Sequence, residues 1–146
     1  MIEQMKPEHA AQVAALEKLC FSDPWSEASI LRECSAPYSL WLVWVEAGEV
    51  LGYVGSQAAP PEADVMNLAV APSCRRRGLG RALMQGLMNR LRATGTEALF
   101  LEVRASNTAA KSLYESLGFC GVGCRKKYYV NPVEDACILR RELKEC

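Results

Sequence analysis

Residues 75–82 read Arg75-Arg76-Arg77-Gly78-Leu79-Gly80-Arg81-Ala82, and they separate two patterned segments. The apolar run Val65–Val70 before them predicts a strand, and leucines spaced four apart after them predict a helix that Gly95 ends. Two glycines let the backbone turn tightly and approach a ligand closely. Because the first turn of a helix offers free N–H groups and a partial positive charge, the stretch predicts an anion site; a solvated basic turn is the alternative.

The glycine spacing excludes two common phosphate-binding motifs. The P-loop pattern Gly-x-x-x-x-Gly-Lys-Ser/Thr is absent, and Gly86 comes too late to complete Gly-x-Gly-x-x-Gly. The predicted anion site is therefore of another kind.

Hydrophobic periodicity and turn residues predict the other elements. The first elements are a strand over Ile2–Met5, a helix opened by Pro7 with an apolar face of Val13, Leu16, Leu19 and Cys20, and a helix from Ser26 to Glu33. Strands over Leu40–Val45 and Val50–Ser56 follow, joined at Ala47-Gly48, and then a loop at Pro60-Pro61-Glu62. The later elements are a strand over Ala98–Val103, a helix over Thr108–Leu117 that is capped by Ser106-Asn107 and closed by Gly118 and Phe119, and one or two strands over Arg125–Leu143. We expect one α/β or α+β domain over residues 1–146, with a central mixed, twisted sheet of about six or seven strands and about four helices on its two faces.

The composition is that of an ordinary globular protein and carries no net charge. Seventeen basic residues balance seventeen acidic ones, so binding to nucleic acid or to an anionic membrane through overall charge is disfavoured. The chain has no run of 18 apolar residues, and its first residues lack the layout of a signal peptide. We therefore expect a cytoplasmic protein without a membrane segment.

Cysteine usage argues against a metal site. The chain has seven cysteines but no Cys-x-x-Cys, and His9 is its single histidine. An odd number of scattered cysteines without an export signal predicts reduced thiols, most of them filling the core. These residues are Cys20, Cys34, Cys74, Cys120, Cys124, Cys137 and Cys146.

Glu102 is the one charged residue in the apolar strand Ala98–Val103, whose composition suits burial on both faces. A buried carboxylate without a partner costs several kcal/mol, so Glu102 either reaches solvent at the strand end or lines a pocket. In a pocket, desolvation can raise the pKa of a carboxyl group and make it a base near neutral pH.

Two further residues have both a structural and a functional interpretation. Tyr114 lies in a helical apolar stripe with Leu113 and Leu117, where packing with a satisfied hydroxyl is the ordinary role. Asn107 precedes the same helix and is first an N-cap and second a ligand contact.

Taken together, these motifs resemble the GCN5-related N-acetyltransferases, whose Arg/Gln-x-x-Gly-x-Gly/Ala motif matches Arg75 to Gly80. The resemblance extends to the RimI-type enzymes that acetylate the N-terminal alanine of a ribosomal protein. The segments that carry it are Pro24-Trp25-Ser26, Asn67-Leu68-Ala69-Val70, Leu101-Glu102-Val103-Arg104-Ala105-Ser106-Asn107, Leu113-Tyr114-Glu115-Ser116-Leu117-Gly118-Phe119, Tyr128-Tyr129 and Glu134-Asp135-Ala136.

The resemblance implies direct acetyl transfer from acetyl-CoA to an amine, with no metal and no covalent enzyme intermediate. Glu102 matches the general base and Tyr114 the general acid of the family. A backbone N–H near Val70 would polarise the thioester carbonyl. The implied cofactor contacts are Leu68, Ala69 and Val70 for the pantetheine, Arg76, Arg77, Gly78, Leu79, Gly80 and Arg81 for the pyrophosphate, and Asn107.

The implied acceptor is a protein N-terminus, the N-terminal alanine of the small-subunit ribosomal protein numbered eighteen. Trp25, Tyr128, Glu134 and Asp135 are candidates for the peptide groove, although the last two are equally consistent with a solvated loop. The alternatives are other protein N-termini, lysines or small amines as acceptors, and a non-catalytic acyl-CoA-binding module. A nucleic-acid-binding domain is disfavoured by the zero net charge and by the glycines beside the arginines.

Overall fold

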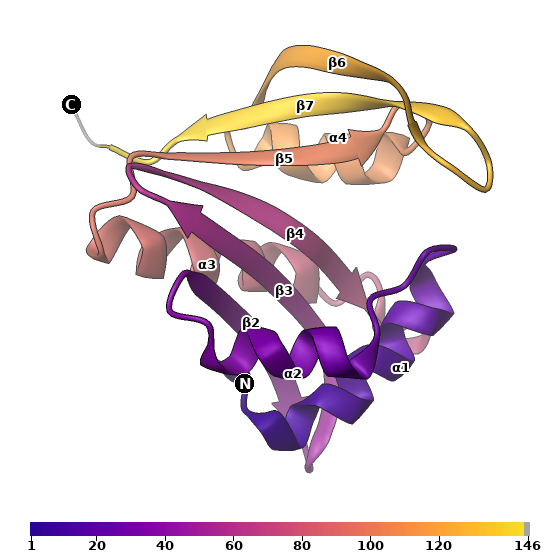
Figure 1. Cartoon of the computed structure of the whole chain (residues 1–146), viewed down its shortest axis with the longest axis vertical. Helices are drawn as coiled ribbons and strands as arrows, with labels where there is room; N and C mark the ends of the chain where they lie inside the picture. The colour runs from indigo at the N-terminus through magenta and orange to yellow at the C-terminus, as the bar shows by residue number, and fades with distance from the viewer. Residues whose placement is uncertain (145–146) are drawn as a thin grey trace.

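The computed structural model describes residues 1–144, which form a seven-stranded sheet with helices on both faces (Figure 1). The helices are α1 (Ala10–Cys20), α2 (Glu27–Ser35), α3 (Leu79–Ala93) and α4 (Thr108–Ser116), with short 3₁₀ turns at Pro7–His9 and Pro72–Cys74. The strands are β1 (Ile2–Gln4), β2 (Ser39–Glu46), β3 (Glu49–Ala59), β4 (Glu62–Val70), β5 (Ala98–Arg104), β6 (Cys120–Tyr129) and β7 (Glu134–Glu142). The predicted α/β architecture with a mixed sheet is confirmed.

The sheet opens at its centre. Its strand order is β1-β2-β3-β4-β5-β7-β6, and within residues 1–144 all neighbours pair antiparallel except β4 and β5, which are parallel. β4 pairs with β5 only from Glu62–Asp64 to Ala98–Phe100. Beyond that point the two strands diverge, as Figure 1 shows, so the sheet forms a V between them.

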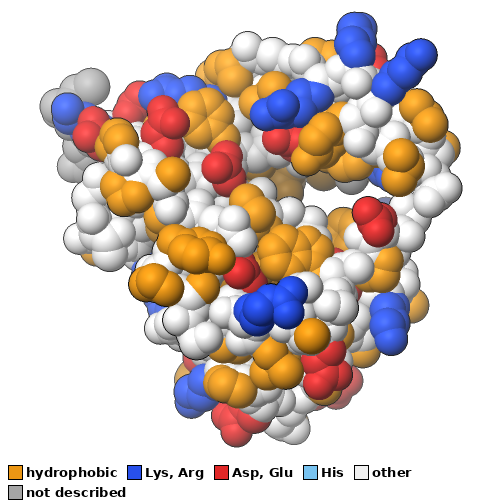
Figure 2. Space-filling model, in the orientation of Figure 1, with side chains coloured by type: hydrophobic (Ala, Val, Ile, Leu, Met, Phe, Trp, Pro, Cys, Tyr) orange, Lys and Arg blue, Asp and Glu red, His pale blue; other side chains and the backbone are white. Residues whose placement is uncertain are grey.

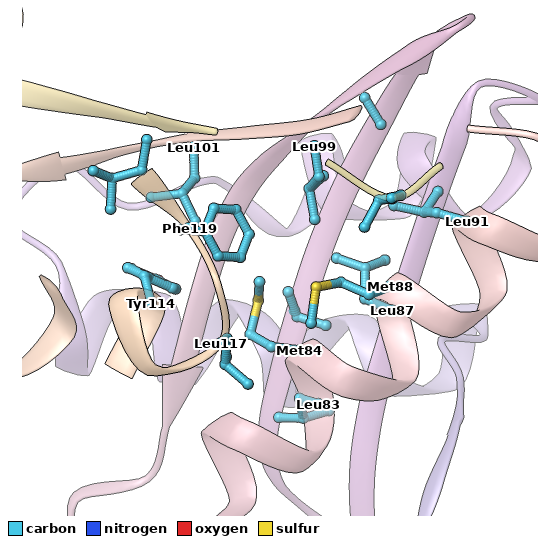
Figure 3. Close-up of a cluster of buried hydrophobic side chains, with 14 of the residues drawn as sticks. Leu83, Met84, Leu87, Met88, Leu91, Leu99, Leu101, Tyr114, Leu117 and Phe119 are labelled. Carbon is cyan, nitrogen blue, oxygen red and sulfur yellow. The ribbon is translucent and has the colours of Figure 1, made fainter. Parts of the chain in front are cut away.

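Each face of the sheet has its own core. α1 and α2 cover one face of β2–β4, and on the other side of the sheet α3 covers β2–β4 while α4 lies against β5 and β7 (Figure 1). The second core joins leucines and methionines of α3 to residues of β5 and α4, including Leu101 and Tyr114 (Figure 3). The two cores hold the halves of the sheet in place while its centre stays open.

Local signals in the sequence account for the helix ends. Ser26 accepts a hydrogen bond from the backbone N–H of Ser29 at 3.1 Å, and Asn107 does the same for Ala110 at 3.1 Å. At the end of α4, Gly118 has φ +94°, and the N–H of Phe119 donates to the carbonyl of Tyr114 at 3.0 Å. These contacts confirm both predicted caps and the predicted closure.

Several predicted boundaries were wrong because strand pairing extends beyond the local pattern. β3 and β4 are longer than predicted and meet at a tight turn at Pro60-Pro61 instead of a loop, so Glu62 is already paired. β6 begins at Cys120, well before Arg125. On α1, Val13 and Leu16 are buried as predicted, whereas Leu19 is 65% exposed.

Burial also corrects two further predictions. β5 is not buried on both faces: Leu99, Leu101 and Val103 enter the core, whereas Phe100 and Glu102 are half-buried because the core beneath α1 and α2 does not extend over β5. Of the six cysteines in the described chain, one, Cys74, is buried, and all six have free thiols. Cys146 lies outside the described residues. Within residues 1–144, no helix is long and apolar enough to cross a membrane.

Candidate functional site

A cleft of about 1130 Å³ lies where β4 and β5 separate, and Figure 2 shows the hollow from outside. Its walls come from segments far apart in the chain: the loop after α1, the end of β4, the cleft-facing side of β5, α4 and the β6–β7 connection. The cleft brings together six of the predicted site residues, namely Trp25, Leu68, Glu102, Asn107, Tyr114 and Tyr128.

The open edge of β4 results from an irregularity in its pairing with β3. Gly55 pairs with Asn67 but Ser56 pairs with Val65, so Met66 is an extra residue that bulges out of the ladder. A bulge bends its strand and increases the local twist. From Val65 onward β4 has no pairing with β5 in the described chain, which leaves backbone groups of this edge accessible to a ligand.

The predicted pantetheine contacts lie on this edge in different environments. Leu68 lines the cleft, whereas Ala69 is buried in the core beneath α1 and α2. The carbonyl of Val70 accepts a hydrogen bond from Arg75 Nε at 3.3 Å. Of the three side chains, only that of Leu68 lines the cleft, so a role for Ala69 or Val70 would have to use the backbone.

The glycine loop leaves backbone groups free at the start of α3. Gly78 is the N-cap of α3 with φ +79°, and no side chain caps the helix. The N–H groups of the first turn are therefore unpaired within the helix, as an anion site requires. A Cβ atom at Gly80 would lie 3.7 Å from Leu113 and 4.0 Å from Leu68, both of which line the cleft. The loop thus borders one end of the cleft.

The arginines around this loop differ in their partners. Arg77 forms an ion pair with Glu46 at 2.7 Å, and this contact is the main reason that the pKa of Glu46 is lowered. Arg81 donates to Ser116 Oγ at 2.6 Å, whereas Arg76 is exposed and has no side-chain hydrogen bond within the described chain. Leu79 is buried, so within this loop it anchors the helix start and only its backbone is available.

Glu102 lines the cleft rather than reaching solvent at the strand end. Its Oε1 accepts a hydrogen bond from Arg125 Nε at 3.2 Å. Its Oε2 is buried and has no hydrogen-bond partner in the described chain. This oxygen is therefore free to accept a hydrogen bond from a molecule bound beside it.

Tyr114 supplies a protonated hydroxyl to the same cleft. Its ring packs edge-on against Phe119 with 5.7 Å between centroids, and it belongs to the core drawn in Figure 3. Burial, with a smaller contribution from Tyr129, raises the pKa of Tyr114 to about 12. Within residues 1–144 its hydroxyl has no hydrogen-bond partner, so its proton is available to a ligand.

The acceptor candidates divide into two groups. Trp25 and Tyr128 line the cleft, the former packed edge-on against Trp41 at 5.3 Å. Glu134 accepts from the backbone N–H of Ser106 at 2.8 Å, and Asp135 accepts from that of Lys127 at 2.8 Å. Neither acidic residue lines the cleft.

The hydrogen bonds of Glu134 and Asp135 lower their pKa values. Both are the first residues of β7: Glu134 ties the strand to Ser106, before α4, and Asp135 ties it to Lys127 of β6, so both carboxylates have structural partners. A place for them in a peptide groove has no support from the cleft geometry.

Three residues were missed by sequence reasoning. Arg125 holds Glu102, and Asp64 lines the cleft with its pKa raised by burial and by the charges of Glu102 and Glu62. Glu17 is fully buried in α1 and accepts hydrogen bonds from Asn67 Nδ2 and from the backbone N–H of Trp25 at 2.8 Å. An acidic residue on an apolar helix face was the available signal for Glu17.

Comparison with known proteins places the chain in a family. Residues 10–119 match the Acetyltransferase (GNAT) family. A ribosomal protein bS18-alanine N-acetyltransferase of Haemophilus ducreyi is 36% identical over 132 residues, which are 90% of each chain. The Escherichia coli K12 enzyme of the same name is 39% identical over 126 residues, 85% of this chain and 84% of that one.

A solved structure agrees over the whole chain. The crystal structure of the Escherichia coli ribosomal-protein-S18-alanine N-acetyltransferase superposes with a TM-score of 0.92 at 33% identity, covering 100% of this chain and 95% of that one. GNAT acetyltransferases use acetyl-CoA as the acetyl donor. The chain belongs to the GNAT acetyltransferase family and is an acyltransferase.

Proposed function

We propose that this protein transfers the acetyl group of acetyl-CoA to the α-amine of the N-terminal alanine of ribosomal protein bS18. Glu102 is the general base and Tyr114 the general acid. The observation that carries the mechanism is the presence, in one cleft, of a buried carboxylate oxygen without a partner and a phenol that stays protonated. The bS18 acceptor is suggested by the names of the bacterial relatives.

The donor end of the cleft suits a long ligand with phosphates at one end. The unpaired N–H groups at the start of α3 and the exposed Arg76 would hold the pyrophosphate. Leu68, Asn107 and the open edge of β4 would hold the pantetheine. When bound, acetyl-CoA supplies the acetyl group as a reactive thioester.

The acceptor amine needs a base before it can react. A free α-amine has a pKa of about 7.7–8.0, so at pH 7 most of it is protonated and has no lone pair to donate. Glu102 Oε2 would accept that proton, directly or through one water, and Arg125 keeps the other oxygen in place. General base catalysis of this kind contributes about 10²–10⁴ in rate.

The leaving group needs a proton. Tyr114 retains its hydroxyl proton at neutral pH because its pKa is raised to about 12, so the phenol can donate to the departing thiolate. Asp64 of β4 adds a second carboxyl group near Glu102 of β5, which favours a cationic acceptor over a neutral one.

The test is acetyl transfer to short peptides, measured by mass spectrometry. The panel varies the first residue, includes an acetyl-blocked peptide with an internal lysine, and adds a polyamine. We expect acetylation of peptides that begin with alanine. Transfer only to the blocked lysine peptide or to the polyamine would assign a different acceptor, and acetyl-CoA binding without any transfer would indicate a non-catalytic module.

A further inference from the structure

We propose that Cys124 and Cys137 form a dithiol site on the side of the sheet away from the cleft, and that this site reacts with low-molecular-weight disulfides by thiol–disulfide exchange. The inference does not depend on the acceptor of the acetyl group. It rests on strand register, exposure and the charges around the two thiols.

The register places the two cysteines directly opposite each other. Cys124 of β6 pairs with Cys137 of β7 in an antiparallel ladder (Figure 1 shows the two strands side by side). Directly opposed residues have Cα atoms about 4.5 or 5.5 Å apart and side chains on the same face. Both separations fall within the range of about 4.4–6.8 Å that a disulfide bridges.

The alternation of side chains along a strand shows on which face of the sheet the two thiols lie. Ile138 lines the cleft, whereas its neighbour Cys137 packs against the core that contains α4. Cys124 shares the face of Cys137, and the next residue, Arg125, points into the cleft toward Glu102. The thiols of β6 and β7 therefore lie on the face of the sheet opposite to the cleft that contains Glu102 of β5.

Accessibility and charge favour attack by Cys124. β6 is the last strand of the sheet, and Cys124 is exposed while Cys137 is half-buried. Lys126 is two residues further along the strand, and its pKa is raised by Asp135, its bonded partner, and by Cys124. Lys126 thus places a positive charge near the exposed thiol.

The reaction proceeds in two balanced steps. The thiolate of Cys124 attacks one sulfur of the disulfide RS–SR, forms a mixed disulfide and expels one RS⁻. The thiolate of Cys137 then attacks the sulfur of Cys124, closes the Cys124–Cys137 bond and expels the second RS⁻. The two protons of the cysteine thiols convert the leaving groups to two RSH molecules, so the cysteines are oxidised and RS–SR is reduced.

Oxidised glutathione is the probe. The reduced full chain is incubated with it under native conditions, free thiols are alkylated, and tryptic peptides are measured by mass spectrometry. Residues 112–125 and residues 128–140 are the expected tryptic peptides. We expect the intact protein to lose two hydrogens, and these two peptides to be joined by a disulfide that a reductant releases.

Cys120 provides the matched control, because it lies in the same tryptic peptide and on the same strand but pairs with Arg140. The cross-link should persist in Cys120→Ser and vanish in Cys124→Ser. Cys137→Ser should stop at the mixed disulfide, with one glutathione on Cys124. A cross-link that needs Cys120, or mixed disulfides without any cross-link in the wild-type chain, would overturn the proposal.

Discussion

The loop at residues 75–81 and the cleft wall around Glu102 are opposite in charge, although the whole chain has no net charge. The loop combines arginines with unpaired N–H groups at a helix start, whereas the wall combines Glu102 and Asp64 with one cation, Arg125, bonded to Glu102. The loop thus suits an anion and the wall suits a cation or a proton. A chain without net charge is not expected to bind nucleic acid or a membrane through its overall charge, but it can still carry two local regions of opposite charge.

The largest effect is expected at the acidic wall. Glu102→Gln keeps the size of the side chain but removes the proton acceptor, so kcat for an alanine-initiated peptide should fall by about 10²–10⁴. Steady-state kinetics measures this change. Glu62→Gln, at an exposed carboxylate on β4, is the control and should leave kcat close to wild type. A Glu102→Gln enzyme with wild-type kcat would remove the assignment of the base.

The next effect tests the proton donor that lies between the two regions. Tyr114→Phe removes a hydroxyl that has no hydrogen bond in the described chain, so kcat should fall by about 10². Thermal stability should change little because the ring still packs against Phe119. Because burial raises the pKa of Tyr114 to about 12, wild-type activity should show no loss from this group up to pH 10. Equal kcat values for variant and wild type would contradict the role.

At the basic loop, Gly78→Asp should weaken acetyl-CoA binding by charge. No atom lies within 4 Å of a Cβ at Gly78, so a clash within the protein, the obvious steric explanation, is absent. A carboxylate beside the pyrophosphate should raise the Kd about tenfold to a hundredfold, or about 1.4–2.8 kcal/mol. Calorimetric titration measures the Kd.

Gly48→Asp is the matched control for this variant. Gly48 has φ +77° and equally open surroundings in the β2–β3 turn, so both variants should lose a similar ~1–2 kcal/mol of folding stability from backbone strain. Only Gly78→Asp should change the Kd. Equal Kd values in the two variants would exclude the loop as the anion site.

The smallest effect concerns the one arginine of the loop that is tied to a carboxylate. Glu46→Gln removes the ion pair with Arg77, in which both side chains are more than 40% exposed (46% and 42%). Exposed ion pairs contribute little to folding because water and salt screen them, so stability should change little. The freed Arg77 should lower the acetyl-CoA Kd about two- to fivefold at low salt, an effect lost near 1 M salt. Unchanged binding at low salt would show that Arg77 does not contact the ligand.

Sequence reasoning succeeded where the signal is local. The caps at Ser26 and Asn107 and the closure at Gly118 were predicted correctly because each depends on residues within one turn. The start of α3 at Gly78 was located by the same kind of signal, whereas anion binding there stays a prediction. Predictions failed where partners are distant, as with Leu19 on α1, which no other element covers.

The cleft residues show the same contrast between local sequence signals and contacts made by distant segments. Glu102 was singled out by its apolar strand, but Arg125, which binds one of its oxygens, carries no signal in its own segment. Glu134 and Asp135 were candidates for the groove from their charge, yet at the start of β7 they accept hydrogen bonds from the backbone N–H groups of Ser106 and Lys127 and do not line the cleft. Such pairings depend on the register of β5, β6 and β7, which a single sequence does not contain.

What the sequence determined by itself is the chemistry of short segments: glycines and arginines before a helix, capping side chains, and a carboxylate in an apolar strand. Only the tertiary structure decided that β4 bulges at Met66 and leaves β5, and that the resulting cleft joins Glu102 to Tyr114. It also decided that Cys124 faces Cys137. The physical reason is that caps and periodicity act over a few residues, whereas register and strand separation depend on packing between segments far apart in the chain.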